Sequence, residues 1–139
     1  MSIELARRAV ACKHWRWAPG MLSRCSTDTR RAVYRWLAGL DTRHYGTVCV
    51  VEDNYGRPWH HGVLAWEPTP DDLPDLSDPA TVGCLLALVR EAWGDPCLHV
   101  GLLPARWGVW TSQNMPLHEC VGKGLTEAEA LVAALEAAP

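Results

Sequence analysis

The stretch DPATVGCLLALVREAWGDP, residues 78–96, decides the fold class. It opens with an aspartate, a residue type that caps helices, followed by a proline, which is favoured at the first helical position. Apolar residues then recur at helical spacing, and Gly94 and Pro96 are typical of a helix end. The pattern predicts a helix over residues 79–93. Its expected buried stripe is formed by Val82, Leu85, Leu86, Val89 and Trp93.

Two more helices are predicted near the ends of the chain. Residues 3–13 carry apolar side chains along one face, and Ser2 is placed to cap them. Thr126 and Glu129 have the spacing of a capping box, which predicts the start of a last helix. The expected buried face of that helix is formed by Ala128, Leu131, Val132 and Leu135.

Several short segments have the composition of β-strands. Residues 47–51 are rich in β-branched side chains, and residues 59–66 follow after a turn signal at 54–57, which predicts a hairpin over 47–66. Further strands are expected at residues 97–103, 107–111 and 117–121, with Gly122-Lys123-Gly124 leading into the last helix.

Two segments between these elements call for separate interpretations. Residues 28–40 fit an amphipathic helix, which we favour, but Ala32 to Leu37 also fit a strand, and that alternative stays open. Residues 67–78 contain three prolines and five acidic residues, which predicts an exposed, solvated loop.

The element order indicates one α+β domain over residues 1–139, with an antiparallel sheet packed against two or three helices. At 139 residues, 48% hydrophobic and 21% charged, the chain has ordinary globular composition. Its longest apolar runs are shorter than a membrane span, and charges occupy the N-terminal region where a signal peptide is apolar. We therefore expect a cytoplasmic protein.

The six cysteines are expected to be reduced and free of metal, because several lie within apolar helix or strand patterns. Cys97 with His99 and His118 with Cys120 share an alternate-residue spacing, so each pair would lie on one face of a strand. Convergence of all four on zinc remains an alternative, although the spacing matches no zinc motif. No metal or other cofactor is predicted.

Catalytic motifs are missing from the sequence. It contains no nucleophile elbow, zincin motif, phosphate-binding loop or dinucleotide fingerprint. We therefore expect a non-catalytic protein.

Charge is divided unevenly along the chain. Residues 1–47 hold nine basic and three acidic residues, whereas residues 48–139 hold four basic and thirteen acidic residues. Such a division is typical of an interaction surface, or of two segments that fold against each other. Eight tryptophans without any phenylalanine add side chains suited to cores and interfaces alike.

Three segments together resemble a family of small proteins encoded by phages and prophages of GC-rich bacteria. They are ELARRAVACKHWRWAPGM, residues 4–21, DPATVGCLLALVREAWGDP, residues 78–96, and LTEAEALVAALEAAP, residues 125–139. The resemblance implies expression in the cytoplasm of an infected bacterium. It further implies an accessory factor that binds a host protein, as inhibitors of CRISPR–Cas effectors do.

The leading functional hypothesis is a binding inhibitor of a host defence or nucleic-acid-handling protein, with acidic groups imitating phosphates. The expected partner-binding residues are Glu67, Asp71, Asp72, Asp75, Asp78, Trp59 and Trp107. The alternatives are a virion or assembly component and a nucleic-acid-binding protein that uses the basic N-terminal third. In the last case the expected binding residues are Arg30, Arg31, Arg35, Lys13 and Arg16.

Overall fold

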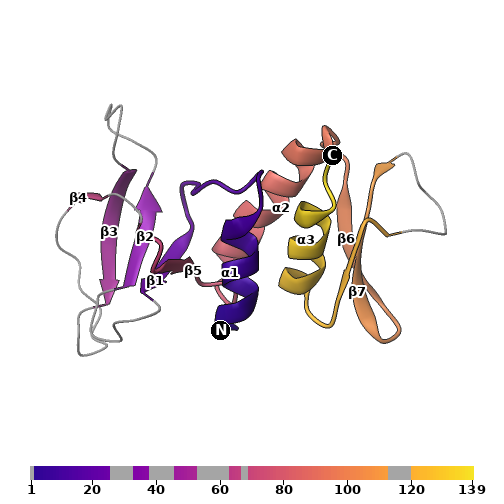
Figure 1. Ribbon diagram of the computed structural model, residues 1–139, viewed down its shortest axis with the longest axis horizontal. Coiled ribbons are helices and arrows are strands. Elements are labelled where there is room, and N and C mark those ends of the chain that lie inside the picture. The colour runs from indigo at the N-terminus through magenta and orange to yellow at the C-terminus, as the bar shows by residue number, and fades with distance from the viewer. Residues whose placement is uncertain (1, 26–32, 38–45, 53–62, 67–68, 113–119) are drawn as a thin grey trace. The chain divides into compact units, whose positions relative to one another are not determined.

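The computed structural model describes residues 2–25, 33–37, 46–52, 63–66, 69–112 and 120–139. For Cys25 and for the described residues from 33 to 66, the description covers the backbone alone. Helices and antiparallel strands alternate in this part of the chain, so the predicted α+β class is confirmed (Figure 1). The elements are α1 (Ile3–Ala11), β1 (Leu22–Cys25), β2 (Val33–Leu37), β3 (Gly46–Glu52), β4 (Val63–Trp66), β5 (Asp72–Pro74), α2 (Pro79–Trp93), β6 (His99–Leu103), β7 (Arg106–Trp110), β8 (Gly122–Gly124) and α3 (Glu127–Glu136).

The chain forms two compact units. The first unit contains Met1–Ala6 and Trp17–Cys84, and the second contains Arg7–Arg16 and Leu85–Pro139. Each unit has its own antiparallel sheet, whereas the sequence analysis expected one sheet. That a single domain covers residues 1–139 stays a prediction.

The sheet of the first unit has the strand order β4-β3-β2-β1-β5. Strands β1 to β4 follow one another as a meander, and β5 then pairs with the free edge of β1. The predicted hairpin over residues 47–66 is confirmed where it is described, because β3 and β4 pair antiparallel. Its turn at residues 54–57 lies outside the described residues.

The favoured helix over residues 28–40 is wrong for residues 33–37, which form β2. This strand has β1 on one side and β3 on the other, so its backbone groups bond to both neighbours. Strand pairing with distant residues therefore overrides the local helical spacing. The remainder of 28–40 lies outside the described residues.

Helix α2 begins and ends as predicted. The carboxylate of Asp78 accepts hydrogen bonds from the backbone N–H of Thr81 at 2.9 Å and from its hydroxyl at 2.8 Å. The Thr81 hydroxyl oxygen also accepts the N–H of Leu22 at 2.8 Å, which ties the helix start to β1. Gly94, with a φ of +61°, ends the helix in the left-handed region.

The buried stripe of α2 differs in part from the predicted one. Leu85 and Val89 are fully buried, and Leu88 joins them. Val82, Leu86 and Trp93, by contrast, are half-buried. Three predicted members thus lie at the margin of the core.

In the second unit, α3 lies on one face of the β6-β7-β8 meander (Figure 1). The predicted cap is confirmed: the Thr126 hydroxyl accepts the Glu129 N–H at 3.1 Å. The Glu129 carboxylate accepts the N–H of Leu125 at 2.7 Å, one residue before the position that a capping box uses. All four residues of the predicted buried face are buried, namely Ala128, Leu131, Val132 and Leu135.

The last strand is shifted from its predicted position. The sequence analysis placed a strand at residues 117–121, but Cys120 and Val121 precede the strand, and β8 is the Gly-Lys-Gly segment. Residues 117–119 lie outside the described residues. Glycine at both ends of β8 lets the strand approach α3 closely. A Cβ built at Gly124 would lie 2.5 Å from the backbone nitrogen of Ala130.

Candidate binding surface

The sheet of the second unit presents two faces of different character. Directly opposed residues share a face, and alternate residues along a strand do too. Val109 and Gly122 are register partners, and both are buried on the face that α3 covers. Trp107, two residues before Val109, lies on the same face. Gly108 and Trp110 therefore belong to the opposite face.

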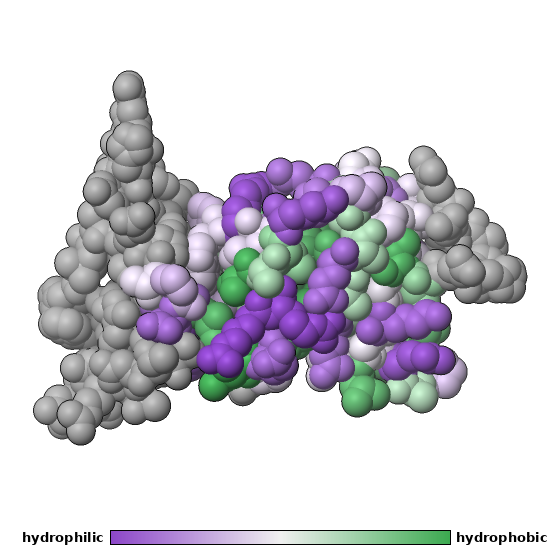
Figure 2. All heavy atoms as spheres, viewed as in Figure 1, coloured by the Kyte–Doolittle hydropathy of each residue, from purple (hydrophilic) through white to green (hydrophobic). Residues whose placement is uncertain are grey.

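Large apolar side chains are exposed at one end of the second unit's sheet. Leu102 on β6 is 71% exposed, and it pairs with the half-buried Trp107 on β7. Trp107 pairs in turn with Gly124, and the next residue, Leu125, is 77% exposed. We call Leu102, Trp107 and Leu125 the leucine–tryptophan patch. In Figure 2, hydrophobic atoms reach the surface of this unit below α3, next to hydrophilic side chains.

The opposite face carries two stacked rings. His99 and Trp110 are register partners, with ring centroids 5.3 Å apart and an interplanar angle of 16°. The same face carries Arg106 and Lys123, both exposed. We call His99, Arg106, Trp110 and Lys123 the ring–cation face.

A cavity of about 460 Å³ lies beyond the end of this sheet, lined by Trp93, Gly94, Asp95, Pro96, Cys97, Thr111 and Ser112. The Asp95 carboxylate accepts the backbone N–H of Ser112 at 2.5 Å, its hydroxyl at 3.0 Å and the N–H of Cys97 at 3.0 Å. These bonds, led by the Ser112 N–H, hold the pKa of Asp95 below its ordinary value. The carboxylate thus joins the loop after α2 to the end of β7.

A second cavity of about 370 Å³ lies between α1 and the C-terminal segment, lined by Arg8, Ala11, Cys12, Lys13, Leu135, Glu136 and Ala138. Arg8 donates to both carboxylate oxygens of Glu136, at 2.9 and 2.6 Å, and this pairing raises the pKa of Arg8. Burial raises the pKa of the Cys12 thiol, so it is less reactive than an ordinary thiol.

The predicted acidic array is not the exposed surface that the sequence analysis expected. Asp72 and Asp75 are each 3% exposed. Asp72 begins β5 at the edge of the first sheet, and Asp75 directly follows that strand. Asp71 is exposed, and Asp78 is half-buried as the cap of α2. Glu67 lies outside the described residues.

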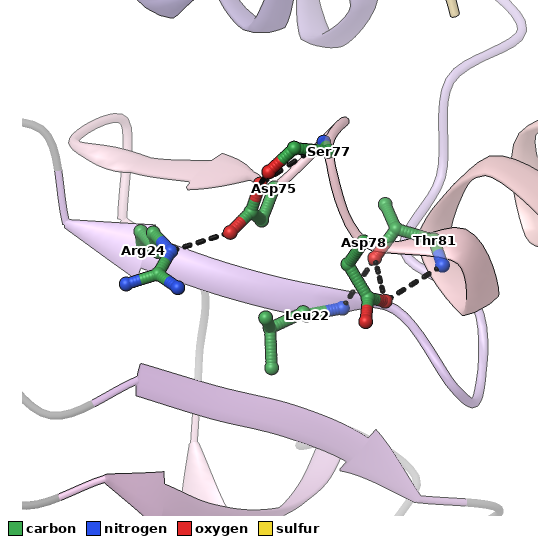
Figure 3. A network of polar contacts seen from close by, with 6 residues as sticks. All are labelled: Leu22, Arg24, Asp75, Ser77, Asp78 and Thr81. Atoms are coloured by element: carbon green, nitrogen blue, oxygen red, sulfur yellow. Dashed lines mark hydrogen bonds and ion pairs between the residues drawn. The ribbon is translucent and has the colours of Figure 1, made fainter. Parts of the chain in front are cut away.

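Asp75 is held by two neighbours (Figure 3). Arg24 donates from Nε at 2.5 Å, and Ser77 donates from its backbone N–H and its hydroxyl. Burial acts to raise the pKa of Asp75, but the hydrogen bonds from Ser77 and Arg24 outweigh it and hold the pKa below the ordinary value. Asp72 accepts the N–H and hydroxyl of Thr69 at 2.9 and 2.7 Å. Both carboxylates therefore serve the fold.

The described basic residues of the alternative hypothesis belong to both units. Lys13 is exposed, and Arg16 is exposed but paired with Glu91. Arg35 lies in β2, opposite Leu22 and Cys49. Arg30 and Arg31 lie outside the described residues, as does Trp59 of the leading hypothesis.

The zinc alternative receives no support from the described residues. Cys97 is exposed, Cys120 is half-buried, and the His99 ring stacks on Trp110. His118 lies outside the described residues. Within the part of the chain that the structure describes, no group of three potential ligands is placed to hold a metal ion.

Of the residues on these two surfaces, only Trp107 was expected to bind a partner and only His99 was a candidate zinc ligand. Leu102 lies in the run Val100-Gly101-Leu102-Leu103, which has no polar residue and gives no sign that its side chain is exposed. Trp110 lies inside the predicted strand 107–111, and its alternation with Arg106 is the signal that was overlooked.

No protein-family model matches the chain, and neither a curated protein nor a solved structure does. Among the described residues, no helix combines the length and apolar character needed to cross a membrane. The geometry of the described residues is therefore the basis for a functional proposal.

Proposed function

We propose that this chain is a non-catalytic binding protein that engages a partner protein through the leucine–tryptophan patch. The observation that carries the proposal is the exposure of Leu102 and Leu125, at 71% and 77%, beside Trp107. Single exposed leucines are common on soluble proteins, but adjoining apolar side chains with a tryptophan are typical of interaction sites. Tryptophan is also the residue type most enriched among those that dominate binding energy.

The leucine–tryptophan patch is large enough to form the centre of an interface, but not a whole interface. A stable interface buries about 800 Å² on each partner, so residues around the patch must contribute its rim. Full burial of a leucine side chain contributes roughly 1.5–3 kcal/mol. Because Leu102 and Leu125 are about three-quarters exposed, burying each would contribute about 1–2 kcal/mol, or roughly 5- to 30-fold in affinity.

We further propose that the partner is a host protein that handles nucleic acid, such as a CRISPR–Cas effector, and that binding inhibits it in the cytoplasm of an infected bacterium. The support for this class of partner is the resemblance of residues 4–21, 78–96 and 125–139 to small phage and prophage proteins. Asp72 and Asp75 have no part in this proposal, because both are buried in the first unit.

The test compares proteins captured from the lysate of a GC-rich bacterium by three immobilised forms of the full chain. These are the wild type, the variant Leu102→Asp/Leu125→Asp, and the control Ile3→Asp. Ile3 is 42% exposed and lies in α1, away from the patch in sequence. We expect a nucleic-acid-handling protein to be captured by the wild type and the control and lost from the double variant.

The captured protein is then assayed for its own activity on nucleic acid. We expect activity to fall as wild-type chain is added, and to persist with the double variant. If the double variant captures the same proteins as the wild type, the patch is not the binding site. A captured partner whose activity does not change would overturn the inhibitory role.

A further inference from the structure

The ring–cation face lies opposite the face that α3 covers. A Cβ built at Gly122 or Gly124 would meet α3, so the side of β8 that carries these glycines faces the helix. Lys123, between them, faces the other way. It pairs with Gly108 on β7, which places Arg106 and Trp110 on the same side. Lys123 and Arg106 are exposed, whereas Trp110 is half-buried.

The Trp110 indole lies across the sheet surface instead of standing away from it. Gly101 and Gly108 are register partners, and a Cβ built at Gly108 would lie 2.8 and 3.0 Å from two atoms of the indole six-membered ring. A Cβ built at Gly101 would lie 3.4 Å from a third atom of that ring. The ring thus occupies space that the glycine at position 108 leaves open, whereas a Cβ at Gly101 would make an ordinary contact with it.

A structural role explains part of this arrangement, since aromatic rings commonly shield glycines within sheets. It does not explain the second ring or the charges. The His99 ring stacks on the indole, with ring centroids 5.3 Å apart. Strands β6, β7 and β8 contain two cations and no acidic residue. Arg106 and Lys123 have no ion-pair partner among the described residues.

Two acidic residues lie near this sheet in the described part of the chain. The Glu129 carboxylate is bound by the N–H of Leu125 at 2.7 Å, on the side of β8 that faces α3. Asp95 bonds to Ser112, two residues beyond Trp110 along the chain. Its carboxylate oxygens are already engaged by the N–H groups of Ser112 and Cys97 and by the Ser112 hydroxyl. The charge of Asp95 is therefore stabilised locally, while Arg106 and Lys123 remain exposed.

Stacked rings flanked by exposed cations match the chemistry of a single nucleic-acid strand. Unpaired bases stack on aromatic side chains, and Arg and Lys neutralise the adjoining phosphates. A duplex offers its phosphates but keeps its bases within the helix, so it cannot use the rings.

We propose that the ring–cation face binds single-stranded nucleic acid, with a base added to the stacked pair of His99 and Trp110 and the neighbouring phosphates held by Arg106 and Lys123. This proposal does not depend on the leucine–tryptophan patch, whose strand residues Leu102 and Trp107 lie on the other face of the sheet. Stacking is tolerant of base identity, so little sequence preference is expected.

The test measures fluorescence anisotropy of a labelled oligothymidine with the full chain over a series of salt concentrations. The variant Arg106→Ala/Lys123→Ala is compared with the control Arg7→Ala/Lys13→Ala. The control removes one exposed arginine and one exposed lysine from α1 and the turn after it. For single strands, each phosphate contact contributes about −0.7 to the slope of log affinity against log salt. The first variant should therefore lose about 1.4 of that slope, and the control should keep it.

The stacking step is tested separately with His99→Ala and Trp110→Leu. Loss of a base–aromatic contact should weaken binding by about 5- to 150-fold. Trp110→Tyr keeps a ring over the glycines, so it should retain the fold and much of the binding even if Trp110→Leu unfolds. Circular dichroism of each variant identifies any that fail to fold.

Three results would overturn the proposal. One is absence of oligothymidine binding at low salt, and another is equal affinity for a duplex of the same length, which would reveal charge attraction without stacking. The third is loss of binding in Arg7→Ala/Lys13→Ala with retention in Arg106→Ala/Lys123→Ala. If the captured partner protein is lost from Arg106→Ala/Lys123→Ala and no oligonucleotide binds, the face belongs to a protein instead.

Discussion

Adding a single methyl group at Gly122 should separate α3 from the sheet of the second unit. A Cβ built there would lie 2.6 Å from the backbone nitrogen of Ala134, 2.7 Å from its Cβ, and closer still to the carbonyl oxygen of Ala130. Two of these three atoms belong to the helix backbone, so no side-chain rotation can relieve the contact. Either the strand or the helix has to move.

The expected loss of unfolding free energy is large for the addition of one methyl group. Overpacking of a well-packed core typically costs about 1–3 kcal/mol. Because the added methyl group would lie between the backbone of β8 and the backbone of α3, we expect Gly122→Ala to cost about 3 kcal/mol, the upper end of this range. This cost is a substantial part of the roughly 5–15 kcal/mol stability of a domain. Urea denaturation followed by far-ultraviolet circular dichroism and by tryptophan fluorescence measures the loss of unfolding free energy.

Gly83→Ala provides the matched control. Gly83 is an exposed position within α2, and a Cβ built there meets nothing within 4 Å. Alanine is the better helix former, so the same substitution should stabilise the chain by about 0.5–1 kcal/mol. If Gly122→Ala stays within about 0.5 kcal/mol of the wild type, the range of an ordinary surface substitution, the close approach of β8 and α3 is refuted.

Burial, ionisation and thiol exposure each give a measurable outcome. Leu85→Ala should cost about 2–5 kcal/mol in urea denaturation because Leu85 is fully buried, and Leu86→Ala should cost less because Leu86 is half-buried. The lowered pKa of Asp75 stabilises the fold above the unfolded value of about 3.9, and this contribution is lost as pH falls through the folded value. Asp75→Asn should therefore show a weaker loss of thermal stability than the wild type between about pH 5 and pH 2. Under iodoacetamide, Cys97 is exposed and should be alkylated before Cys12, whose thiol pKa is raised by burial, as followed by peptide mass spectrometry.

Contrary outcomes are equally definite. Equal costs for the two leucine variants would place both side chains in the core. An unchanged acid dependence in Asp75→Asn would mean that its hydrogen bonds do not hold the carboxylate in the charged form. Alkylation of Cys12 before Cys97 would contradict the burial of the first thiol.

Helices were the most predictable part of the fold, because their ends carry local chemical signals. The caps of α2 and α3 depend on bonds across three residues, from Asp78 to Thr81 and from Thr126 to Glu129. Such bonds can be anticipated from spacing alone.

Strand β2 shows where local spacing fails. Val33, Trp36 and Leu37 have the intervals of a helix face, yet their partners lie on β3 at Glu52, Val48 and Thr47. A strand between two others takes its hydrogen bonds from residues far along the chain, and the period of its own side chains does not report them.

The acidic loop shows the same limit for a candidate site. Proline and aspartate favour an exposed turn, and the bonds between Asp75 and Ser77 agree with that local reading. The buried Asp75 carboxylate, however, is paired with Arg24, which is 51 residues away along the chain. The exposure of Leu102 could not be predicted from the sequence either, because it depends on how far α3 extends along the sheet.

The pairing of β1 with β5 has a consequence for the order in which the sheets can form. Ser23 and Pro74 are register partners, so β5 has to close a loop that contains β2, β3 and β4 before it can pair. Loop closure costs about 0.6 kcal/mol more for each doubling of loop length, and folding slows as contacts become less local. In the other sheet, the turn between β6 and β7 is two residues long, from Leu103 to Arg106. The β6–β7 hairpin should therefore form early, and closure of β1 by β5 should be among the last and slowest events of folding.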